Sequence, residues 1–341
     1  MIVHDEQVGV VYYPAKGAVA ATTPRHAQII EQIWRDYLDN RLSEFDRKNF
    51  EGYVEQSFAG KPDLPMRKYP NLRESCVLGR LEILLANRCN LNCRYCYAHG
   101  GDYGTEEQVL TPELAQKYLR ALILEKYTAV DVVVFFGGEP TMAPDTIQTI
   151  CEFFEQYTNS GALEKMPVFT MVTNGTLIHE ALVRTLRKYK VRVTVSVDGP
   201  PEINDRLRVD KVGNGTFSRI EHGIRLLREA GIPPKTLEAT YTTLHKKMGY
   251  TRQDIRRCLQ ERFDMDSENI IMAECESNGY DDTLAFRPDE VPEEKNLLPV
   301  LHFRRLLARG DFCDLSCLAG IQPAVLFPNG DIYPCHHFFG Q

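Results

Sequence analysis

The sequence predicts an α/β fold: a partial (β/α)6, TIM-like barrel with a small N-terminal α+β region and a short C-terminal extension. From about residue 80, strand-like runs alternate with helical stretches, a pattern that favours a parallel sheet. The residues of unusual type follow the ends of these runs, and barrels of this kind carry their chemistry at the carboxyl ends of their strands. A doubly wound open sheet is the competing arrangement.

Each predicted strand is a short apolar or alternating run, and each predicted helix has apolar residues on one face. The strands cover residues 81–86, 131–136, 167–173, 191–197, 236–242 and 269–273. The helices cover residues 112–127, 144–158, 178–189, 216–230 and 251–262. Capping signals mark their starts, such as Thr111-Pro112-Glu113 and Pro144-Asp145.

Residues 1–75 have a different character from the rest of the chain. Two strand-like runs, 8–13 and 17–22, flank a turn, and a helical pattern follows with apolar residues from Ile29 to Tyr37 on one face. We therefore expect four regions: an N-terminal accessory region over 1–75, the barrel over 76–275, a linker with a helix over 276–312, and the extension over 313–341.

Composition and charge argue against several classes of protein. The chain has 341 residues, of which 43% are hydrophobic, enough to bury one large α/β domain and smaller pieces. The net charge of −7 and the lack of a dense Lys/Arg run argue against a nucleic-acid partner. No apolar run is long enough to span a bilayer and no signal peptide is recognisable, so we expect a cytoplasmic protein without a membrane partner.

Ten cysteines are many for a chain expected in a reducing compartment, where clustered cysteines indicate metal. Cys89, Cys93 and Cys96 follow the first predicted strand with the spacing CxxxCxxC. Three thiolates on one loop can hold three irons of a cubane cluster, which leaves the fourth iron open to a small molecule with an amine and a carboxylate. The alternative is a structural zinc, for which His99 is the local candidate for a fourth ligand.

The cysteine loop resembles the signature of radical S-adenosylmethionine (radical SAM) enzymes, and Tyr95 matches the aromatic residue that this family places beside its cluster. The resemblance implies a [4Fe–4S] cluster on the three cysteines, with S-adenosylmethionine chelating the open iron. It also implies the chemistry. An electron, supplied by a donor such as flavodoxin or ferredoxin, cleaves the sulfonium C–S bond, and the resulting 5′-deoxyadenosyl radical abstracts a hydrogen atom from substrate.

Two further motifs resemble the same family. Gly137-Gly138-Glu139-Pro140 follows the second predicted strand, and the resemblance implies that this turn contacts the amino group of the cofactor, with Glu139 as the partner of the ammonium. Ser196 ends the fourth strand and Arg208 follows it. Both are implied as ligands of the cofactor's ribose or carboxylate, with Arg206 as the rival of Arg208.

The remaining candidates lie on neighbouring strand ends. Thr173 and Asn174 end the third strand, and we expect them to line the same rim. Thr240 and Thr242 share a face of the fifth strand because side chains alternate along a strand. Glu238 stands on that strand where the resemblance implies an arginine, so the adenosine side of the site departs from the family's pattern.

A second cysteine group lies near the C-terminal end. Pro328-Asn329-Gly330-Asp331 predicts a hairpin turn, which would bring Cys317 towards Cys335. With Gly330, these cysteines resemble the start of the SPASM extension, which implies an auxiliary Fe–S cluster with Cys313 as a third ligand. That extension has further cysteines, whereas six residues follow Cys335 here, so we expect a fragment of a longer protein or an incomplete auxiliary site. The alternative is two core cysteines in a hairpin.

The glycine-rich stretch after the cysteine loop and the second cysteine group resemble enzymes that modify ribosomally made peptides. We therefore expect a peptide or protein substrate. The leading product is a thioether crosslink from a cysteine sulfur to carbon, as in the quinohemoprotein amine dehydrogenase maturase type, and the alternative is oxidation of Ser or Cys to formylglycine, as by sulfatase maturases. A zinc-binding protein without enzymatic activity is the alternative from another class. Residues 1–75 resemble a reduced peptide-recognition module, and a plain structural cap on the barrel is the alternative.

Overall fold

The computed structural model describes residues 2–4, 9–13, 18–57, 76–275, 277, 282–286 and 323–335 of the chain. These residues fall into two compact units, one up to Ser57 and one from Cys76 onward. The linker predicted over 61–70 lies outside the described residues. Within the described part of the chain, no helix is both long enough and apolar enough to cross a membrane.

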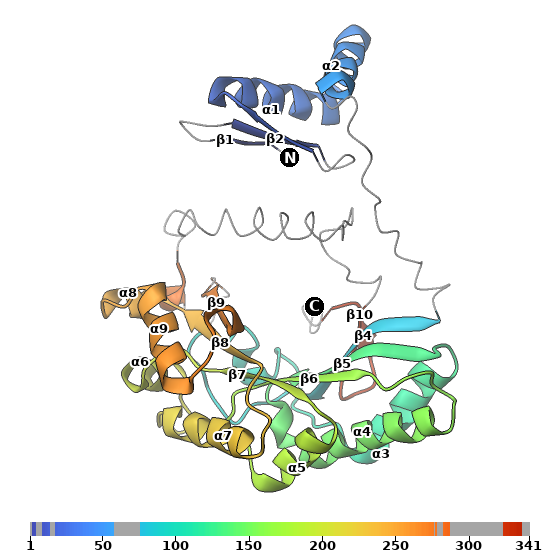
Figure 1. Cartoon of the computed structure of the whole chain (residues 1–341), viewed down its shortest axis with the longest axis vertical. Coiled ribbons are helices and arrows are strands. Elements are labelled where there is room, and N and C mark those ends of the chain that lie inside the picture. The colour runs from blue at the N-terminus through green and yellow to red at the C-terminus, as the bar shows by residue number, and fades with distance from the viewer. Residues whose placement is uncertain are drawn as a thin grey trace. The chain divides into compact units, whose positions relative to one another are not determined.

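The N-terminal unit combines a three-stranded antiparallel sheet with two helices (Figure 1). The strands are β1 (Ile2–His4), β2 (Gly9–Tyr13) and β3 (Ala18–Thr22), and the helices are α1 (Pro24–Leu38) and α2 (Glu44–Ser57). The two predicted strands and the predicted helix are confirmed, whereas β1 and α2 were not predicted. The sequence of α2 has no continuous apolar face, and α2 contacts α1 through Phe50, whose ring lies against Trp34 and Tyr37.

The larger unit is built on an eight-stranded sheet with the order β11-β10-β4-β5-β6-β7-β8-β9. The predicted strands are confirmed as β4 (Val77–Ala86), β5 (Ala129–Gly137), β6 (Val168–Thr173), β7 (Arg192–Ser196), β8 (Thr236–Tyr241) and β9 (Ile270–Glu274). Each pairs in parallel with the next strand along the chain. A doubly wound sheet needs a reversal of strand order, so that arrangement is wrong and the partial barrel is confirmed.

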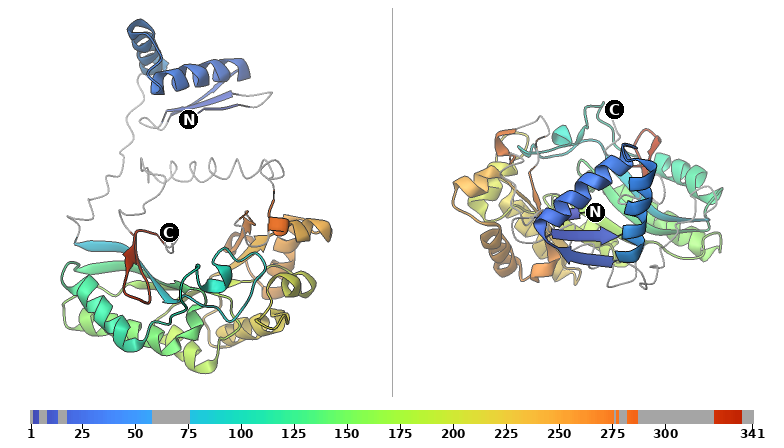
Figure 2. Two further views of the ribbon diagram at one scale, coloured as in Figure 1. Left: turned by 180° about the vertical axis from the view of Figure 1, so that it is seen from behind. Right: turned by 90° about the horizontal axis from the view of Figure 1, so that it is seen from above.

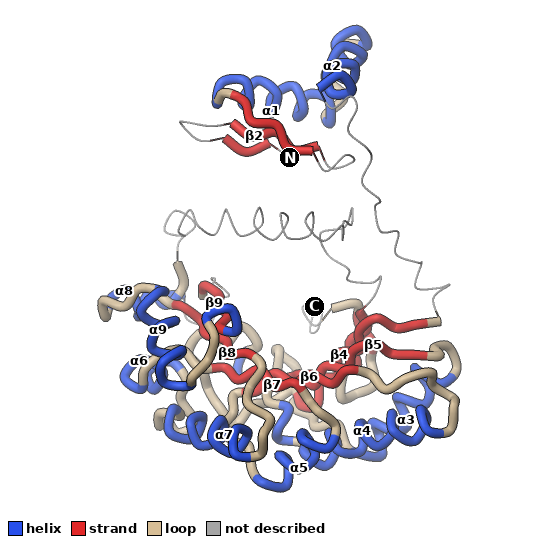
Figure 3. The backbone as a smooth tube through the Cα atoms, viewed as in Figure 1, coloured by secondary structure: helices blue, strands red, loops and turns tan. Residues whose placement is uncertain are grey.

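Helices cover one side of this sheet, and the sheet curves away from them as an open arc (Figure 2, Figure 3). The predicted helices are confirmed as α3 (Pro112–Leu119), α4 (Pro144–Asn159), α5 (Glu180–Lys188), α7 (Phe217–Glu229) and α9 (Arg252–Phe263). The first of them continues as a π-helical turn over Arg120–Leu124, which accounts for most of the longer predicted range. Two short helices, α6 (Pro201–Leu207) and α8 (Thr243–Lys247), were not predicted.

The hydrophobic core lies between the sheet and the helices. On one face of the strands the side chains are fully buried, among them Leu81, Ile83, Val133, Phe135, Phe169, Met171, Val195 and Leu237. Phe135 and Phe169 of neighbouring strands stack with ring centroids 5.7 Å apart. Because side chains alternate along a strand, the opposite face is left for polar residues and for a site.

The predicted C-terminal hairpin is confirmed as β10 (Pro323–Leu326) and β11 (Ile332–Tyr333), which pair antiparallel. Its turn contains Gly330 at φ 93°, a conformation that glycine adopts without strain. The sequence did not indicate where the hairpin docks: β10 pairs in parallel with β4, the first strand of the barrel.

Candidate functional site

The three cysteines of the CxxxCxxC loop lie between β4 and a short 3-10 turn, His99–Gly101. Hydrogen bonds hold this loop against the end of α6 and the chain that follows it: the Asn92 N–H donates to the Val209 carbonyl at 2.7 Å, and the Arg94 N–H donates to the Leu207 carbonyl at 3.0 Å. The loop is therefore fixed from both sides, by the strand before it and by a segment more than a hundred residues later.

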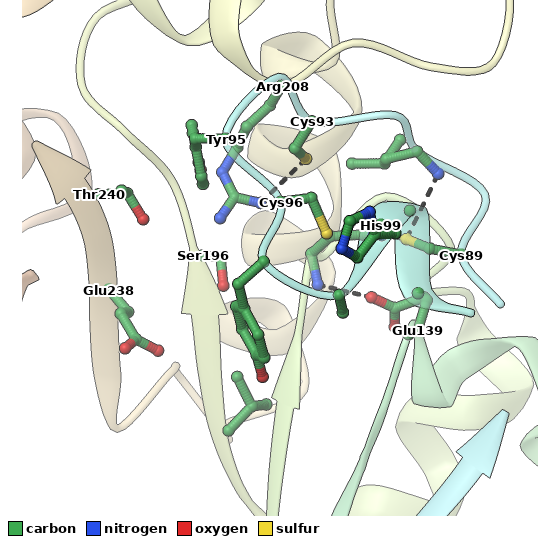
Figure 4. Close-up of a pocket in the computed structure, with 18 of the residues that line it drawn as sticks. Cys89, Cys93, Tyr95, Cys96, His99, Glu139, Ser196, Arg208, Glu238 and Thr240 are labelled. Carbon is green, nitrogen blue, oxygen red and sulfur yellow. Dashed lines mark hydrogen bonds between the residues drawn. The ribbon is translucent and has the colours of Figure 1, made fainter. Parts of the chain in front are cut away.

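All three thiols line one cavity of about 1070 Å³ at the carboxyl ends of the strands (Figure 4). Cys89 Sγ accepts a hydrogen bond from the Leu91 N–H at 3.4 Å, and Asn174 Nδ2 lies 3.6 Å from the same sulfur. Burial raises the pKa of Cys89 and of Cys93 to about 12. Both thiols are therefore protonated at neutral pH until a metal displaces the proton.

The donor set suits a cluster with an open corner better than a single ion. Among the described residues, no group of three or more His, Cys, Asp or Glu side chains is gathered closely enough to hold one metal ion. A structural zinc needs four ligands within about 2.3 Å. Three thiols spread around the wall of a cavity instead match the three protein-bound irons of a cubane.

The Gly137-Gly138-Glu139-Pro140 turn packs directly on the cysteine loop. The Gly138 N–H donates to the Ala86 carbonyl at 2.7 Å, and the Glu139 N–H donates to the Arg88 carbonyl at 3.0 Å. A Cβ on Gly138 would lie 2.2 Å from the Arg88 oxygen, so only glycine allows this contact between two backbones. Gly137 and Gly138 both line the cavity, as predicted, and they also shape the loop that carries the thiols.

The Glu139 carboxylate is 1% exposed and accepts four hydrogen bonds from the protein. Thr141 donates twice to Oε1, through N–H at 3.0 Å and Oγ1 at 2.6 Å, and Thr173 Oγ1 donates to the same oxygen at 2.6 Å. The Asn174 N–H donates to Oε2 at 2.7 Å. Burial raises the pKa of Glu139 despite these hydrogen bonds, which favour the ionised form.

Asp198, which follows β7, connects the cysteine loop to the opposite wall and is fully buried. Its Oδ2 accepts a hydrogen bond from the Tyr95 hydroxyl at 2.5 Å and lies 3.2 Å from Arg208 Nε. Its Oδ1 accepts a hydrogen bond from the Thr240 N–H at 3.0 Å. The sequence alone assigned no role to this aspartate, although an acidic residue at the end of a strand was the available signal.

The wall across from the thiols comes from β7 and β8. Ser196, Glu238 and Thr240 line it, and Ser196 and Glu238 are paired in register (Figure 4). Burial raises the pKa of Glu238, and the described residues provide its carboxylate with no hydrogen bond or ion pair. Asn174 and Thr173 line the cavity as expected.

One expectation about the rim is wrong, and the choice between two arginines is decided in favour of the expected one. Thr242 does not continue the face of β8, because the strand ends at Tyr241 and Thr242 instead caps α8, where it is fully buried. Arg206 is exposed on α6 and does not line the cavity, whereas Arg208 is buried and does. Further lining residues that the sequence did not single out are Tyr97, Tyr103, Phe136, Cys275 and Ser277.

The predicted auxiliary site stays a prediction. Cys335 is half-buried after β11, whereas Cys313 and Cys317 lie outside the described residues.

Comparison with known families gives one match over the barrel. The family model of the Radical SAM superfamily matches residues 83–283, which is more than half of the chain. The match contains the cysteine loop, the Gly137–Pro140 turn and the segment from Ser196 to Arg208.

Curated relatives share about a quarter to a third of the aligned residues. The radical SAM cyclopropyl synthase TigE of Paramaledivibacter caminithermalis is 26% identical over 226 residues, 60% of this chain and 46% of the relative. The cysteine-type anaerobic sulfatase-maturating enzyme of Clostridium perfringens is 30% identical over 152 residues, 41% of this chain and 38% of the relative. The chain thus spans about half the length, or less, of these relatives.

Solved structures share the fold at low sequence identity. A structure of anSMEcpe with bound AdoMet gives a TM-score of 0.59 at 20% identity and covers 76% of this chain and 75% of that one. Streptococcus suis SuiB bound to S-adenosylmethionine gives a TM-score of 0.52 at 15% identity and covers 99% of this chain and 82% of that one.

Proposed function

The chain belongs to the radical SAM superfamily of enzymes, whose cofactors are a [4Fe–4S] cluster and S-adenosylmethionine, and from that premise we propose that it matures a peptide or protein by hydrogen abstraction. The observation that carries the proposal is the convergence of three thiols and one buried carboxylate on a single cavity. The thiols provide an open-cornered ligand set, and the carboxylate provides a partner for an ammonium group.

Cys89, Cys93 and Cys96 would hold the cluster. When bound, the cluster and S-adenosylmethionine supply a 5′-deoxyadenosyl radical through reductive cleavage of the sulfonium C–S bond. Glu139 receives the cofactor's ammonium on Oε2, since this oxygen carries one protein hydrogen bond while Oε1 carries three. Asn174 fixes this end of the site because it contacts both Glu139 and the Cys89 sulfur.

Ser196 and Arg208 bind the carboxylate or ribose of the cofactor from the other side of the cavity. Arg208 engages Asp198 through Nε and approaches the Cys93 sulfur through Nη1, which leaves Nη2 for a carboxylate oxygen. Tyr95 packs beside Cys93 and Arg208, with the guanidinium carbon 5.7 Å from the centre of its ring. Gly137 and Gly138 keep the backbone close to the cofactor.

The size of the cavity supports a substrate larger than the cofactor. Pockets for drug-sized ligands span about 300–1,000 Å³, and this cavity, of about 1070 Å³, leaves room for part of a peptide beside S-adenosylmethionine. The names of the sulfatase-maturating relatives and a SuiB structure with the precursor peptide SuiA support a peptide or protein substrate. The leading product is a thioether crosslink from a cysteine sulfur to carbon, and the second candidate is formylglycine, which the sulfatase-maturase relatives favour.

Two partners belong to this proposal. A reduced flavodoxin or ferredoxin delivers the electron. The N-terminal unit binds a leader segment of the substrate by adding it as a strand, which its small antiparallel sheet supports, since β1 and β3 form the two edges of that sheet.

Anaerobic reconstitution with iron and sulfide tests the assignment. We expect a brown protein with four irons at the cysteine loop, which releases 5′-deoxyadenosine on addition of dithionite and S-adenosylmethionine. Cys93→Ala abolishes this release, whereas Cys258→Ala, a half-buried cysteine on α9, leaves it unchanged. Stoichiometric zinc without iron, or undiminished release by Cys93→Ala, contradicts the proposal and favours a zinc-binding protein.

Mass spectrometry of the substrate separates the two products. Both reactions remove two hydrogens, but formylglycine made from cysteine also exchanges its sulfur for an oxygen from water, with release of hydrogen sulfide. A product that keeps sulfur and no longer reacts with thiol reagents supports the thioether.

A further inference from the structure

Asp198 brings together three donors from three separate segments. The Tyr95 hydroxyl comes from the cysteine loop, the Arg208 guanidinium from the end of α6, and the Thr240 N–H from β8. The hydroxyl and the N–H donate hydrogen bonds to the two oxygens of one fully buried carboxylate, and the guanidinium forms an ion pair with it, although its Nε makes no hydrogen bond among the described residues. A carboxylate has acceptor capacity for all of them, whereas an amide has one oxygen and would turn its NH₂ group towards at least one donor.

The guanidinium held in this way lies between Asp198 and a thiol. Arg208 is 8% exposed, its Nε lies 3.2 Å from Asp198 Oδ2, and its Nη1 lies 3.9 Å from Cys93 Sγ (Figure 4). Arg208 therefore places its charge beside the sulfur of a predicted cluster ligand.

We propose that Asp198 is a positioning residue: it holds the Arg208 guanidinium against the Cys93 sulfur, and the fixed positive charge makes the cluster easier to reduce. A cluster gains one negative charge on reduction, so a buried cation beside a ligand sulfur stabilises the reduced form more than the oxidised form. This stabilisation of the reduced cluster is strong in a site of low dielectric constant, and it is lost when the guanidinium moves away from the sulfur into solvent. The inference rests on the cluster of the proposed function and not on the substrate or the product.

The first test replaces the charge. Arg208→Gln and the matched variant Arg206→Gln are reconstituted, and their iron content is measured. The midpoint potential of the cluster is then determined without S-adenosylmethionine, in a potentiometric titration monitored by electron paramagnetic resonance. We expect Arg208→Gln to reduce the equilibrium constant for one-electron reduction at least tenfold, a shift of at least 59 mV to more negative potential. Arg206→Gln keeps the wild-type potential because its side chain is exposed and outside the cavity. Equal potentials in both variants overturn the proposal.

The second test separates positioning from simple charge cancellation, because the two give opposite signs. If Asp198 only neutralised Arg208, Asp198→Asn would remove a negative charge and shift the potential to a more positive value. If Asp198 positions Arg208, the NH₂ group of the substituted amide repels the guanidinium, the cation leaves Cys93, and the potential shifts to a more negative value. A positive shift or no shift overturns the positioning role.

A third variant keeps the proposal testable if Asp198→Asn does not fold. Arg208→Lys keeps the charge but lacks the fork that contacts both Asp198 and Cys93, so its potential falls between those of wild type and Arg208→Gln. A potential equal to that of wild type overturns the positioning role. If the wild-type protein takes up a cluster but releases no 5′-deoxyadenosine, the proposed function is contradicted. The role of Asp198 is still decided by the measured potentials, because they require only the bound cluster.

Discussion

The proposed ammonium site at Glu139 can be tested by replacing a single heavy atom. Glu139→Gln keeps the shape of the side chain but converts one carboxylate oxygen into NH₂. The orientation that still satisfies Thr141 and Thr173 places the NH₂ group against the Asn174 N–H. One buried acceptor is lost, and two donors face each other.

The expected magnitudes follow from the hydrogen bonds that change. A buried donor left without an acceptor costs about 1–3 kcal/mol, so we expect the free energy of unfolding of Glu139→Gln to fall by about that amount. A hydrogen bond to a charged group contributes about 1.5–3 kcal/mol. Loss of the ammonium partner therefore weakens binding of S-adenosylmethionine by roughly 10- to 150-fold.

Equilibrium dialysis of S-adenosylmethionine against the reconstituted protein measures the affinity, and thermal unfolding measures the stability. Glu261→Gln, an exposed position on α9, is the matched control and changes neither quantity. A Glu139→Gln protein that is less stable but binds S-adenosylmethionine with wild-type affinity refutes the assignment, since the carboxylate would then serve only to hold Thr141, Thr173 and Asn174 together.

Three further variants test the site and the sheet. Gly138→Ala brings a Cβ to 2.2 Å from a backbone oxygen of the cysteine loop, so we expect less iron per chain after reconstitution. The control Gly52→Ala, which has open space around its Cβ, should bind as much iron as wild type. Equal iron contents in the two variants contradict the reasoning. Burial raises the pKa of Glu238 above its ordinary value of 4.5, so its contribution to stability is present below that value and is lost as the pH rises through the folded-state pKa. Glu238→Gln should therefore melt at a higher temperature than wild type at pH 7 but not below pH 4.5, and a difference that is independent of pH argues against this account. Gly330→Ala would hold an alanine at φ 93° with its Cβ 2.8 Å from the Tyr118 ring. We therefore expect the free energy of unfolding, measured with denaturant, to fall by about 1 kcal/mol or more. An unchanged midpoint of denaturant unfolding contradicts this prediction.

The barrel could be predicted because its signals are local. Each strand is an apolar or alternating run, and α3 begins after Thr111, whose side chain accepts a hydrogen bond from the Leu114 N–H. The short helices α6 and α8 escaped prediction because they span too few turns to show a period. The pairing of β10 with β4 also has no local signal, since it joins segments from distant parts of the chain.

The same distinction between local and distant signals applies to the residues of the site. The cysteine spacing and the Gly137–Pro140 turn can each be recognised from a few consecutive residues of the sequence. The role of Asp198 cannot be recognised in this way, because it depends on contacts with Tyr95, Arg208 and Thr240 that form only in the folded protein. Thr242 was assigned wrongly because alternation predicts direction only while the strand continues, and β8 ends one residue earlier.

The pairing of β4 with β10 has a consequence for the order of synthesis. A ribosome makes β4 through β9 in the order in which they pair, so each new strand finds its neighbour already present. Among the described residues, the part of β4 from Arg80 to Ile83 pairs on one side only with β10, so until β10 emerges this stretch of strand edge can template contacts with other nascent chains. Translation speed and chaperone supply over this interval should therefore affect the yield of native protein more than they affect its final stability.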